Sequence, residues 1–552
     1  MNSPILKISE LKVRTTRQPH PRTVLDGISL DINPGETLCV VGESGSGKSV
    51  TALSVMGLLP RGAMAPAGGS ILLDGEELLQ ASAERLRALR ATRMAMVFQE
   101  PMTALNPVER VGSQIDEVLR THAWLSHAER TEQVLAMLDA VGLPNPSLIY
   151  DAYPHQLSGG QRQRIIISMA LILRPKLMIA DEPTTALDVT TQRQILSLIR
   201  ELQKKHNTAV MFVTHDFGVV QEIADRIVVM HRGRIVETGS REQILARPQK
   251  PYTRMLVSSV PSLIPVKRPP TEGETVLNVE ALNKTYIERR LFGRSRIVAA
   301  AQEVGLTLRR GEIAGIVGES GSGKSTVARC IVRLIDPDSG AIWIGGKNIA
   351  HASRRRLRPM RRRVQIVFQD PYRSLNPRLP VGDSLVEGLV NFGSPREVAL
   401  AKARRMLQVV GLDTDIMHRF PHQFSGGQRQ RICIARALAI EPDILIADEA
   451  VSSLDVSVQA QVLRLLEDIR AKTGIAVLFI THDLRVAAQI CDTIMVMQMG
   501  RIVEAGSAVS VLTAPREDYT RALIDAAPGR DWDFQNFRPA QGPVSAGAKI
   551  AH

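Results

Sequence analysis

The same glycine-rich segment, GESGSGKS, occurs twice in this chain, from Gly42 to Ser49 and again from Gly318 to Ser325. In such a segment the glycines let backbone N–H groups close around phosphate oxygens, the lysine reaches the β- and γ-phosphates, and the last hydroxyl binds Mg²⁺. Each copy follows an apolar run that is typical of a buried strand, ETLCVVG in the first case and EIAGIVG in the second. The segments therefore predict two nucleotide sites, formed by Gly42, Glu43, Ser44, Gly45, Ser46, Gly47, Lys48, Ser49 and Val50, and by Gly318, Glu319, Ser320, Gly321, Ser322, Gly323, Lys324, Ser325 and Thr326.

Two further apolar runs, KLMIADE and DILIADE, end in a pair of acids, Asp181 with Glu182 and Asp448 with Glu449. Ligands of open α/β sheets bind beyond the carboxyl ends of the strands, so we expect these acids at the nucleotide. Phosphoryl transfer to water needs one carboxylate for the metal and a second for the attacking water. A purely structural ion pair is the weaker interpretation.

Three more polar motifs occur once in each half: VFQ ends at Gln99 and Gln369, SGGQRQRI begins at Ser158 and Ser425, and THD contains His215 and His482. A Ser-Gly-Gly turn before a helical run predicts that the serine caps the helix. This interpretation is compatible with a functional one, because a helix N-terminus is itself an anion site. A histidine at a strand end is usually structural, but both histidines recur at the same distance from the acids. That spacing favours a contact with the γ-phosphate.

The order of the motifs is repeated along the chain. The two lysines are 276 residues apart, the two glutamines 270, and the remaining motifs 267. A unit of about 250 residues is far longer than a solenoid repeat, so it indicates two duplicated domains. Strand-like runs that alternate with helical runs predict an α/β fold with a mainly parallel central sheet. We predict a first domain over 1–250, a proline-rich linker over 251–275, a second domain over 276–528, and a disordered tail over 529–552.

The composition narrows the function classes. The chain has 552 residues, of which 44% are apolar, which is enough for more than one core. No apolar segment reaches the roughly 18 residues of a spanning helix, and the first residues do not resemble a signal peptide. The four cysteines lack the paired spacing of a zinc site or a disulfide framework, which favours a reducing, cytosolic compartment. These cysteines are Cys39, Cys330, Cys433 and Cys491.

The formal net charge of +13 is compatible with binding to nucleic acid or to an anionic membrane surface. The densest basic run, SRRRLRPMRRRV over 353–364, contains no aromatic residue on which a base could stack. We therefore expect it to form a solvated helix, with a phosphate or lipid-headgroup contact as the alternative, and we expect no nucleic-acid partner.

The motif order resembles the ATP-binding cassette (ABC) superfamily over essentially the whole chain apart from linker and tail. LSGGQ at Leu157–Gln161 and FSGGQ at Phe424–Gln428 match that family's signature motif. The resemblance implies two tandem P-loop NTPase domains, each with a mainly parallel sheet and a helical subdomain that carries the signature motif. It also implies that the two domains pair within the chain, head to tail, around two ATP molecules. One ATP would lie between Lys48, Gln99, Asp181, Glu182 and His215 and the signature residues Ser425, Gly426, Gly427 and Gln428; the other would lie between Lys324, Gln369, Asp448, Glu449 and His482 and the signature residues Ser158, Gly159, Gly160 and Gln161.

The same resemblance implies roles for these residues. Glu182 and Glu449 would act as bases, the histidines would brace the γ-phosphate, and the glutamines would act at the same reaction centre. Mg²⁺ would be held by Ser49, Gln99 and Asp181 in one site and by Ser325, Gln369 and Asp448 in the other. ATP binding would close the pair and hydrolysis would release it.

Two positions depart from the family pattern. The aromatic residue that stacks on adenine matches Tyr286 in the second half, whereas Thr15 takes the equivalent place in the first. The second half reads DEAVSSLD where the first has the usual DEPTTALD. Because Glu449 and Asp455 are kept, we expect both sites to hydrolyse ATP.

Within the superfamily, QEPMTALNP and QDPYRSLNP resemble the ATPases of bacterial dipeptide, oligopeptide, glutathione and nickel importers. So does a proline shortly before a Tyr-Thr pair, at Pro251 with Tyr252-Thr253 and at Pro515 with Tyr519-Thr520. A fused pair resembles the glutathione-type and microcin-peptide-type members. The resemblance implies a peripheral ATPase at the cytoplasmic face of the bacterial inner membrane, with two transmembrane permease subunits and a periplasmic solute-binding protein as partners.

The alternative is a soluble tandem-cassette ATPase that acts on the ribosome or on nucleic acid. Members of that group resemble chains with a long, charged, helical linker, whereas this predicted linker is short and rich in proline. A DNA-repair cassette would carry zinc-binding cysteine pairs, which this sequence lacks. The second half of a sugar-importer ATPase commonly departs from the motifs, whereas both halves of this chain keep them. The importer interpretation is therefore the one that the sequence favours.

Overall fold

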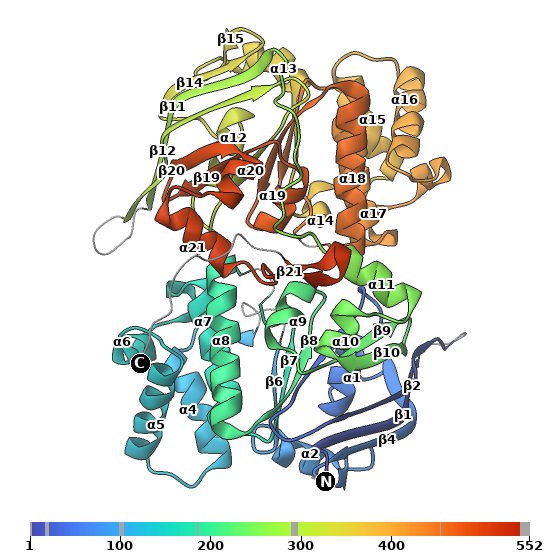
Figure 1. Cartoon of the computed structure of the whole chain (residues 1–552), viewed down its shortest axis with the longest axis vertical. Coiled ribbons are helices and arrows are strands. Elements are labelled where there is room, and N and C mark those ends of the chain that lie inside the picture. The colour runs from blue at the N-terminus through green and yellow to red at the C-terminus, as the bar shows by residue number, and fades with distance from the viewer. Residues whose placement is uncertain are drawn as a thin grey trace. The chain divides into compact units, whose positions relative to one another are not determined.

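The computed structural model describes residues 3–16, 21–98, 104–184, 187–288, 296–452 and 454–540. The chain divides into two compact units. The first comprises Met1–Val260 together with Phe534–Pro539, and the second comprises Pro261–Asp533 together with Ala540–His552. The two units contain closely similar series of strands and helices (Figure 1), as expected for a duplicated domain.

Each unit has a six-stranded central sheet. In the first unit the strands are β3 (Thr37–Val41), β6 (Met94–Val97), β7 (Leu177–Asp181), β8 (Ala209–Val213), β9 (Arg226–His231) and β10 (Arg234–Ser240). Their order is β10-β9-β3-β8-β7-β6, and only β10 pairs antiparallel. All residues of β3, β7 and β8 are buried, which explains why these strands are continuous apolar runs in the sequence.

The first unit also has a second, antiparallel sheet of order β2-β1-β4-β5, whose strands are β1 (Leu6–Thr15), β2 (Thr23–Ile32), β4 (Met64–Leu73) and β5 (Glu76–Glu77). The sequence did not predict this sheet. The helices are α1 (Lys48–Val55), α2 (Ala83–Leu89), α4 (Val111–His122), α5 (His127–Ala140), α6 (Pro146–Asp151), η1 (Pro154–Gln156), α7 (Gly159–Leu171), α8 (Val189–His206), α9 (Phe217–Ile223), α10 (Arg241–Ala246) and α11 (Pro251–Ser258).

The second unit repeats this plan, with a central sheet of order β16-β17-β18-β13-β19-β20 and an antiparallel sheet of order β12-β11-β14-β15. The strands are β11 (Thr275–Glu288), β12 (Arg296–Arg309), β13 (Ile313–Val317), β14 (Ser339–Ile344), β15 (Lys347–Asn348), β16 (Val364–Val367), β17 (Ile444–Asp448), β18 (Ala476–Thr481), β19 (Thr493–Gln498) and β20 (Arg501–Ser507). The helices are α12 (Lys324–Ile331), α13 (Arg354–Arg363), α14 (Pro371–Ser374), α15 (Val381–Asn391), α16 (Arg396–Val409), η2 (Thr414–His418), η3 (Pro421–Gln423), α17 (Gly426–Ala439), α18 (Val456–Thr473), α19 (Leu484–Ile490), α20 (Ala508–Thr513) and α21 (Asp518–Ala526).

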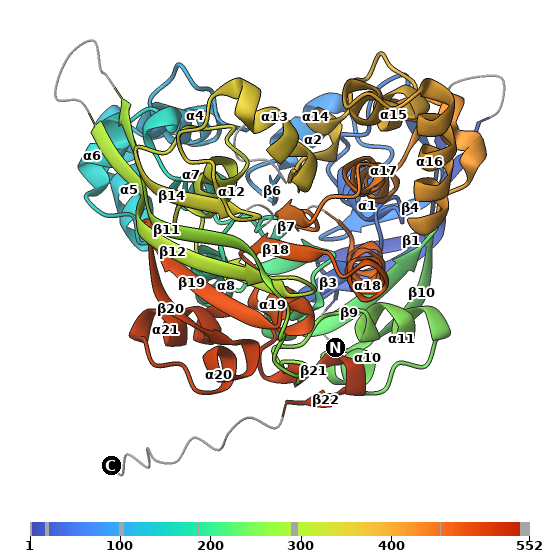
Figure 2. The ribbon, with the colours of Figure 1, turned by 90° about the horizontal axis from the view of Figure 1, so that it is seen from above.

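A helical subdomain stands apart from the antiparallel sheet in the second unit. In both views α15, α16 and α17 gather on one side of this unit, and β11, β12 and β14 lie on the other (Figures 1 and 2). Helix α17, which begins with the signature motif, packs against α15 and α16. The predicted fold class, a mainly parallel α/β domain with a helical signature subdomain, is therefore confirmed.

The basic run forms α13, and its arginines are exposed or half-buried while Leu357 and Met360 are buried. This is the amphipathic, solvated helix that the sequence predicted. None of the helices in the described residues is both long and apolar enough to cross a membrane.

Part of the predicted linker is ordered. Residues 251–258 form α11, which starts with a proline at its first position, where the missing N–H costs nothing. Its Thr253, Leu256 and Val257 are buried at the spacing of one helix face. The sequence window was too short to reveal this period.

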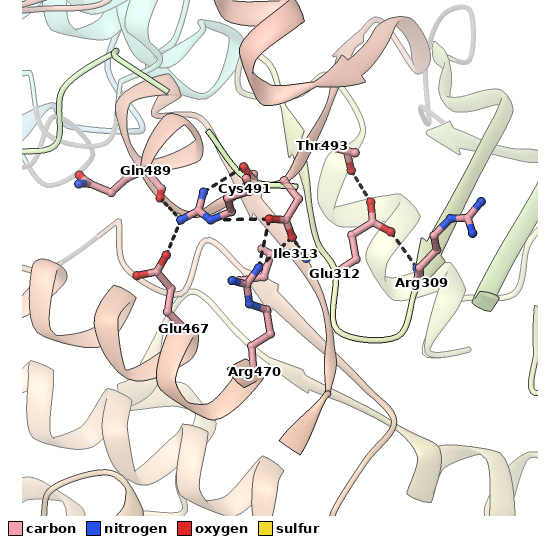
Figure 3. A network of polar contacts seen from close by, with 10 residues as sticks. Arg309, Glu312, Ile313, Glu467, Arg470, Gln489, Cys491 and Thr493 are labelled. Atoms are coloured by element: carbon pink, nitrogen blue, oxygen red, sulfur yellow. Dashed lines mark hydrogen bonds and ion pairs between the residues drawn. The ribbon is translucent and has the colours of Figure 1, made fainter. Parts of the chain in front are cut away.

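Further along the predicted linker, Arg268 is fixed to the second unit. Its guanidinium donates to the Glu467 carboxylate and to the Gln489 carbonyl at 2.6 Å. It also lies 3.6 Å from the carboxylate of Asp492, which accepts the Ile313 N–H at 2.8 Å. Figure 3 shows this network, in which Arg470 approaches the same carboxylate at 2.9 Å.

The tail that we expected to be disordered from residue 529 is ordered up to 540 and forms β21 (Trp532–Asp533), η4 (Phe534–Asn536) and β22 (Arg538–Pro539). Phe534 is completely buried, and η4 contacts α11 in the first unit. Burial of one aromatic side chain outweighs the Gly, Pro and polar composition that predicted disorder. Residues 541–552 of the predicted tail lie outside the described part of the chain.

Candidate functional site

Each glycine-rich segment connects a buried strand to a helix, β3 to α1 in the first unit and β13 to α12 in the second. Gly42 and Gly318, the first residues of the segments, have φ angles of 150° and 151°. A Cβ atom on either would stand 2.2 Å from a backbone carbonyl oxygen, that of Met230 or Met497. Only glycine fits these positions, so both units form the same tight turn.

The lysine of each segment points back into its own loop. Lys48 Nζ donates to the carbonyl oxygens of Gly42 at 2.7 Å and Glu43 at 3.1 Å. Lys324 Nζ donates to those of Gly318 and Glu319, both at 2.7 Å. Both lysines are buried. Each ammonium is thus held at the start of its helix, where the helix dipole also favours an anion.

The other residues of the segments lie where the sequence predicted, in the loop or in the first turn of the helix. The loop residues are Ser44, Gly45, Ser46 and Gly47, and Ser320, Gly321, Ser322 and Gly323; the helix residues are Val50 and Thr326.

The hydroxyl that ends each segment contacts the aspartate that ends the neighbouring strand. Ser49 Oγ donates to Asp181 Oδ1 at 3.1 Å, and Ser325 Oγ donates to Asp448 Oδ1 at 2.8 Å. Burial raises the pKa of both aspartates, and the charge of the adjacent glutamate adds to this, although the serine hydroxyl and the loop lysine oppose it. Hydroxyl and carboxylate oxygens are ligands that Mg²⁺ accepts, so the donor set fits this metal.

The glutamate after each strand faces the histidine of the neighbouring strand. His215 Nδ1 lies 3.0 Å from Glu182 Oε1, and His482 Nδ1 lies 3.5 Å from Glu449 Oε1. Gln369 Nε2 donates to the other carboxylate oxygen of Glu449 at 2.7 Å. The structure therefore brings together the predicted strand acids, histidine and glutamine in the second unit, and the acids and histidine in the first.

Burial acts to raise the pKa of Glu449, but the contact with His482 and the charges of His482 and Lys324 hold it below its usual value. In turn Glu449 raises the pKa of His482 against the effect of burial. Glu449 is accordingly a carboxylate at neutral pH and can accept a proton.

Both glutamates have a left-handed backbone, with φ of 47° at Glu182 and 49° at Glu449. Residues other than glycine seldom adopt this conformation, and such strain gathers at functional sites. The sequence carried no signal for this conformation.

The signature motifs begin α7 and α17. Ser158 Oγ accepts the Gln161 N–H at 3.2 Å, and Gln161 Oε1 accepts the Ser158 N–H at 3.0 Å. Ser425 and Gln428 make the same reciprocal cap, at 3.3 and 3.1 Å. These hydrogen bonds confirm the predicted helix caps. Both serines are exposed. The predicted contact of each motif with the ATP of the other half stays a prediction.

Gln99 lies outside the described residues. Tyr286, predicted to stack on adenine, lies on β11 with 36% of its surface exposed and with Lys284 Nζ 5.8 Å from its ring centre. Thr15, its counterpart, uses its hydroxyl to accept the Arg22 N–H at 2.8 Å.

Sequence reasoning missed one group of residues at the phosphate loops. Tyr252 and Tyr519 were noted only as part of a subfamily motif, yet both contact the residue after the first glycine of the loop. His231 was not noted at all, although its ring lies 4.1 Å from that of Tyr252. No spacing rule joins residues this far apart in the sequence.

Comparisons with known proteins agree with this geometry. A family model described as "ABC transporter" matches residues 25–185 and 301–452, and a model described as "Oligopeptide/dipeptide transporter, C-terminal region" matches residues 236–296. The glutathione import ATP-binding protein GsiA of Escherichia coli O6:H1 is 46% identical over 95% of this chain and 89% of its own length. The peptidoglycan transport ATP-binding protein YejF of Agrobacterium fabrum is 45% identical over 95% of this chain and 96% of its own length.

The matched segments cover more than half of the chain and include both glycine-rich loops, both signature motifs and both pairs of strand acids. The two relatives align over nearly the whole of their own length, so the likeness extends to the tandem arrangement. This chain therefore belongs to the ABC transporter family, and its two cassettes are ATP-binding ATPase domains.

Proposed function

We propose that this chain is the ATP-hydrolysing subunit of an importer for peptides or related small solutes such as glutathione. The observation that carries the proposal is the presence, in each cassette, of a loop lysine, a serine–aspartate pair and a glutamate–histidine pair in contact distance. The match to the oligopeptide transporter C-terminal region and the names of the two relatives support the class of cargo.

ATP hydrolysis here depends on positioning and charge neutralisation. Lys48 and Lys324 leave their loop carbonyls and donate to the β- and γ-phosphates. Glu182 and Glu449 accept a proton from the attacking water, and His215 and His482 hold the γ-phosphate. Gln369 orients the water beside Glu449, and Gln99 is assigned the same role in the first site by its motif.

Mg²⁺ fits the serine–aspartate pairs, and when bound it neutralises charge on the β- and γ-phosphates. Ser49, Asp181 and Gln99 would hold it in the first site, and Ser325, Asp448 and Gln369 would hold it in the second. The fold itself keeps the serine hydroxyl and the aspartate carboxylate of each pair close together, through the hydrogen bond between them.

The two cassettes pair head to tail within the chain, so that the signature helix of each completes the ATP site of the other. The N–H groups in the first turns of α7 and α17 are suited to bind the γ-phosphate. ATP then draws the cassettes together and hydrolysis lets them separate. Tyr286 supports the adenine in the second site only.

The partners in this proposal are two transmembrane permease subunits and a periplasmic solute-binding protein, with the chain bound peripherally at the cytoplasmic face of the inner membrane. The cargo is selected by those partners. The basic surface of α13 is compatible with a nearby anionic membrane.

The test is ATP hydrolysis by the purified chain, alone and with co-expressed membrane subunits in lipid. We expect Glu182→Gln and Glu449→Gln each to remove most of the activity, since each removes a base at one of two coupled sites. Glu132→Gln, a change at an exposed position on α5, is the matched control and should leave hydrolysis unchanged.

The proposal requires that membrane subunits and a peptide-loaded binding protein stimulate the wild-type rate. If RNA or ribosomes stimulate it and the membrane subunits do not, the soluble tandem-cassette function takes its place.

A further inference from the structure

Helices α11 and α21 occupy the same place in the two units. Along the chain, each comes after the last strand of the central sheet and one short helix, which is α10 in the first unit and α20 in the second. In both views α11 lies beside α10, and α21 lies beside α20 (Figures 1 and 2). Glu237 on β10 fixes the start of α11 by accepting the N–H groups of Gln249 at 2.7 Å and Lys250 at 3.1 Å. Glu504 on β20 accepts the two corresponding N–H groups before α21, at 2.9 and 3.2 Å.

Both helices also have one fully buried threonine, Thr253 and Thr520, whose exposed fraction is 0%. The capped start and the buried threonine together fix how each helix is rotated about its axis. The residue just before each threonine is a tyrosine, and its direction is fixed with the helix.

In the first unit this tyrosine reaches the phosphate loop through a side chain. Tyr252 donates its phenol hydrogen to Glu43 Oε2 at 3.2 Å. His231 packs against the Tyr252 ring with 4.1 Å between ring centres, and its Nδ1 lies 3.9 Å from the same carboxylate oxygen. Glu43 directly follows the first glycine of the loop, and its carbonyl oxygen accepts a hydrogen bond from Lys48, the lysine of the phosphate loop.

In the second unit the tyrosine reaches the loop backbone. The Glu319 N–H donates to the Tyr519 hydroxyl oxygen at 3.3 Å. Glu319 again directly follows the first glycine, and its carbonyl oxygen accepts from Lys324 at 2.7 Å. The backbone of Glu319 is thus held at its N–H by the helix and at its carbonyl oxygen by the lysine.

We propose that Tyr252 and Tyr519 are positioning residues for ATP, each holding the second residue of its own phosphate loop in the shape that receives the phosphates. The two contacts differ in chemistry, carboxylate in the first unit and backbone N–H in the second, but they act on the same loop position. The inference rests on the ATPase activity of the family and does not depend on which cargo is carried.

The effect of one hydrogen bond sets the size of the change. A bond of this kind stabilises the conformation that it holds by about 0.5–1.5 kcal/mol, which sets a limit of about a 2- to 10-fold change in affinity when ATP requires that conformation. The bond to the charged carboxylate of Glu43 belongs at the upper end, because charge-assisted bonds are stronger. The bond between the Glu319 N–H and a neutral hydroxyl belongs at the lower end.

The experiment measures binding of a non-hydrolysable ATP analogue with Mg²⁺ to the full-length chain, by calorimetry, with one loop disabled at a time. In a Lys324→Ala background only the first loop binds. There Tyr252→Phe should raise the Kd about 5- to 10-fold, and Tyr519→Phe should leave it unchanged. In a Lys48→Ala background the roles reverse, with about a 2- to 5-fold rise for Tyr519→Phe only.

Two further readouts separate positioning from a general structural role. The double variant Tyr252→Phe with Tyr519→Phe should raise the KM for ATP while kcat stays within about twofold, since the reacting groups are untouched. Its thermal unfolding temperature without nucleotide should fall by no more than a few degrees, since loss of about 1 kcal/mol lowers it by about 2–4 °C in a domain of this size.

Weakening of both loops by either single substitution, or a fall in the unfolding temperature of more than about 10 °C, would overturn the proposal in favour of a structural role. Unchanged affinity in both backgrounds would overturn it as well. None of these outcomes involves membrane partners, so a failure here is distinguishable from a failure of the importer assignment.

Discussion

Replacing Gly427 with alanine should destabilise the second unit, whereas the same change at its neighbour Gly426 should not. Both glycines belong to the signature motif and lie in the first turn of α17. A Cβ atom on Gly427 would stand 2.3 Å from Val458 Cγ1 on α18, while a Cβ atom on Gly426 would meet no atom of the described residues within 4 Å. The two substitutions are thus chemically identical and differ only in the space that each methyl group finds.

The magnitude follows from this geometry. An ordinary contact between carbon atoms is about 3.5–4.0 Å, so α17 or α18 must give way by more than about 1 Å. Val458 is β-branched and is restricted to one main χ1 rotamer in a helix, so its methyl group cannot rotate aside. Overpacking of this kind costs about 1–3 kcal/mol, and the better helix propensity of alanine returns up to about 1 kcal/mol. Gly426→Ala gains this helix propensity without the overpacking cost.

The assay is thermal unfolding of the full-length variants under identical scan conditions, because a chain of two units has no single two-state transition. Because both variants gain the same helix propensity, they should differ by the overpacking cost of about 1–3 kcal/mol, which corresponds to about 2–12 °C for a domain of this size. The first unit offers a replicate, since a Cβ atom on Gly160 would stand 2.4 Å from Thr191 Cγ2, whereas one on Gly159 would meet its nearest atom among the described residues, Leu187 Cδ2, at 3.8 Å. If Gly426→Ala unfolds at as low a temperature as Gly427→Ala, the packing argument is refuted.

Phe534→Ala should release the C-terminal segment from the first unit, because it removes a fully buried aromatic side chain at a cost of about 3–5 kcal/mol; limited proteolysis should cut near residue 534 in this variant but not in the exposed control Gln535→Ala. Arg268→Ala should lower the free energy of unfolding of the second unit by about 1.5–3 kcal/mol, since its bonds involve charged groups, and denaturant unfolding should show no such loss for the exposed neighbour Lys267→Ala. Alkylation of the four cysteine thiols at pH 8 should be slow in the folded chain and fast after unfolding, because burial raises the pKa of every thiol, to about 11 in two cases. A thiol that reacts rapidly in the native chain would contradict the packing. The thiols concerned are Cys39, Cys330, Cys433 and Cys491, with about 11 for Cys330 and Cys433.

Much of the candidate site was open to prediction from the sequence, because its chemistry is encoded locally. Gly42 and Lys48 lie at the two ends of one loop, and Asp181 directly follows the apolar residues of its strand, so short-range rules of turns and strand ends place them. Because the chain contains two copies of the domain, each site residue could be assigned from its motif in both copies. The predicted strands β3, β7 and β8 and their counterparts β13, β17 and β18 are confirmed for the same reason, since each is an uninterrupted apolar run.

Other features depended on contacts between distant parts of the chain. The linker and tail predictions rested on composition, and they missed α11 and Phe534 because a short segment becomes ordered when a neighbouring surface buries its few apolar side chains. The left-handed backbone of Glu449 is likewise imposed by its surroundings, since glutamate has no preference of its own for that conformation.

The sequence alone determined that this chain binds and hydrolyses ATP in two cassettes, because the groups that hold phosphate are adjacent along the chain and their spacing is itself the signal. Only the tertiary structure decided which side chains support those groups. Tyr252 reaches Glu43 across 209 residues and Tyr519 reaches Glu319 across 200, and no periodicity or spacing rule extends over such distances. Packing of α11 and α21 against their own units brings each pair together, since burial of apolar surface fixes the positions of helices independently of the distance along the chain.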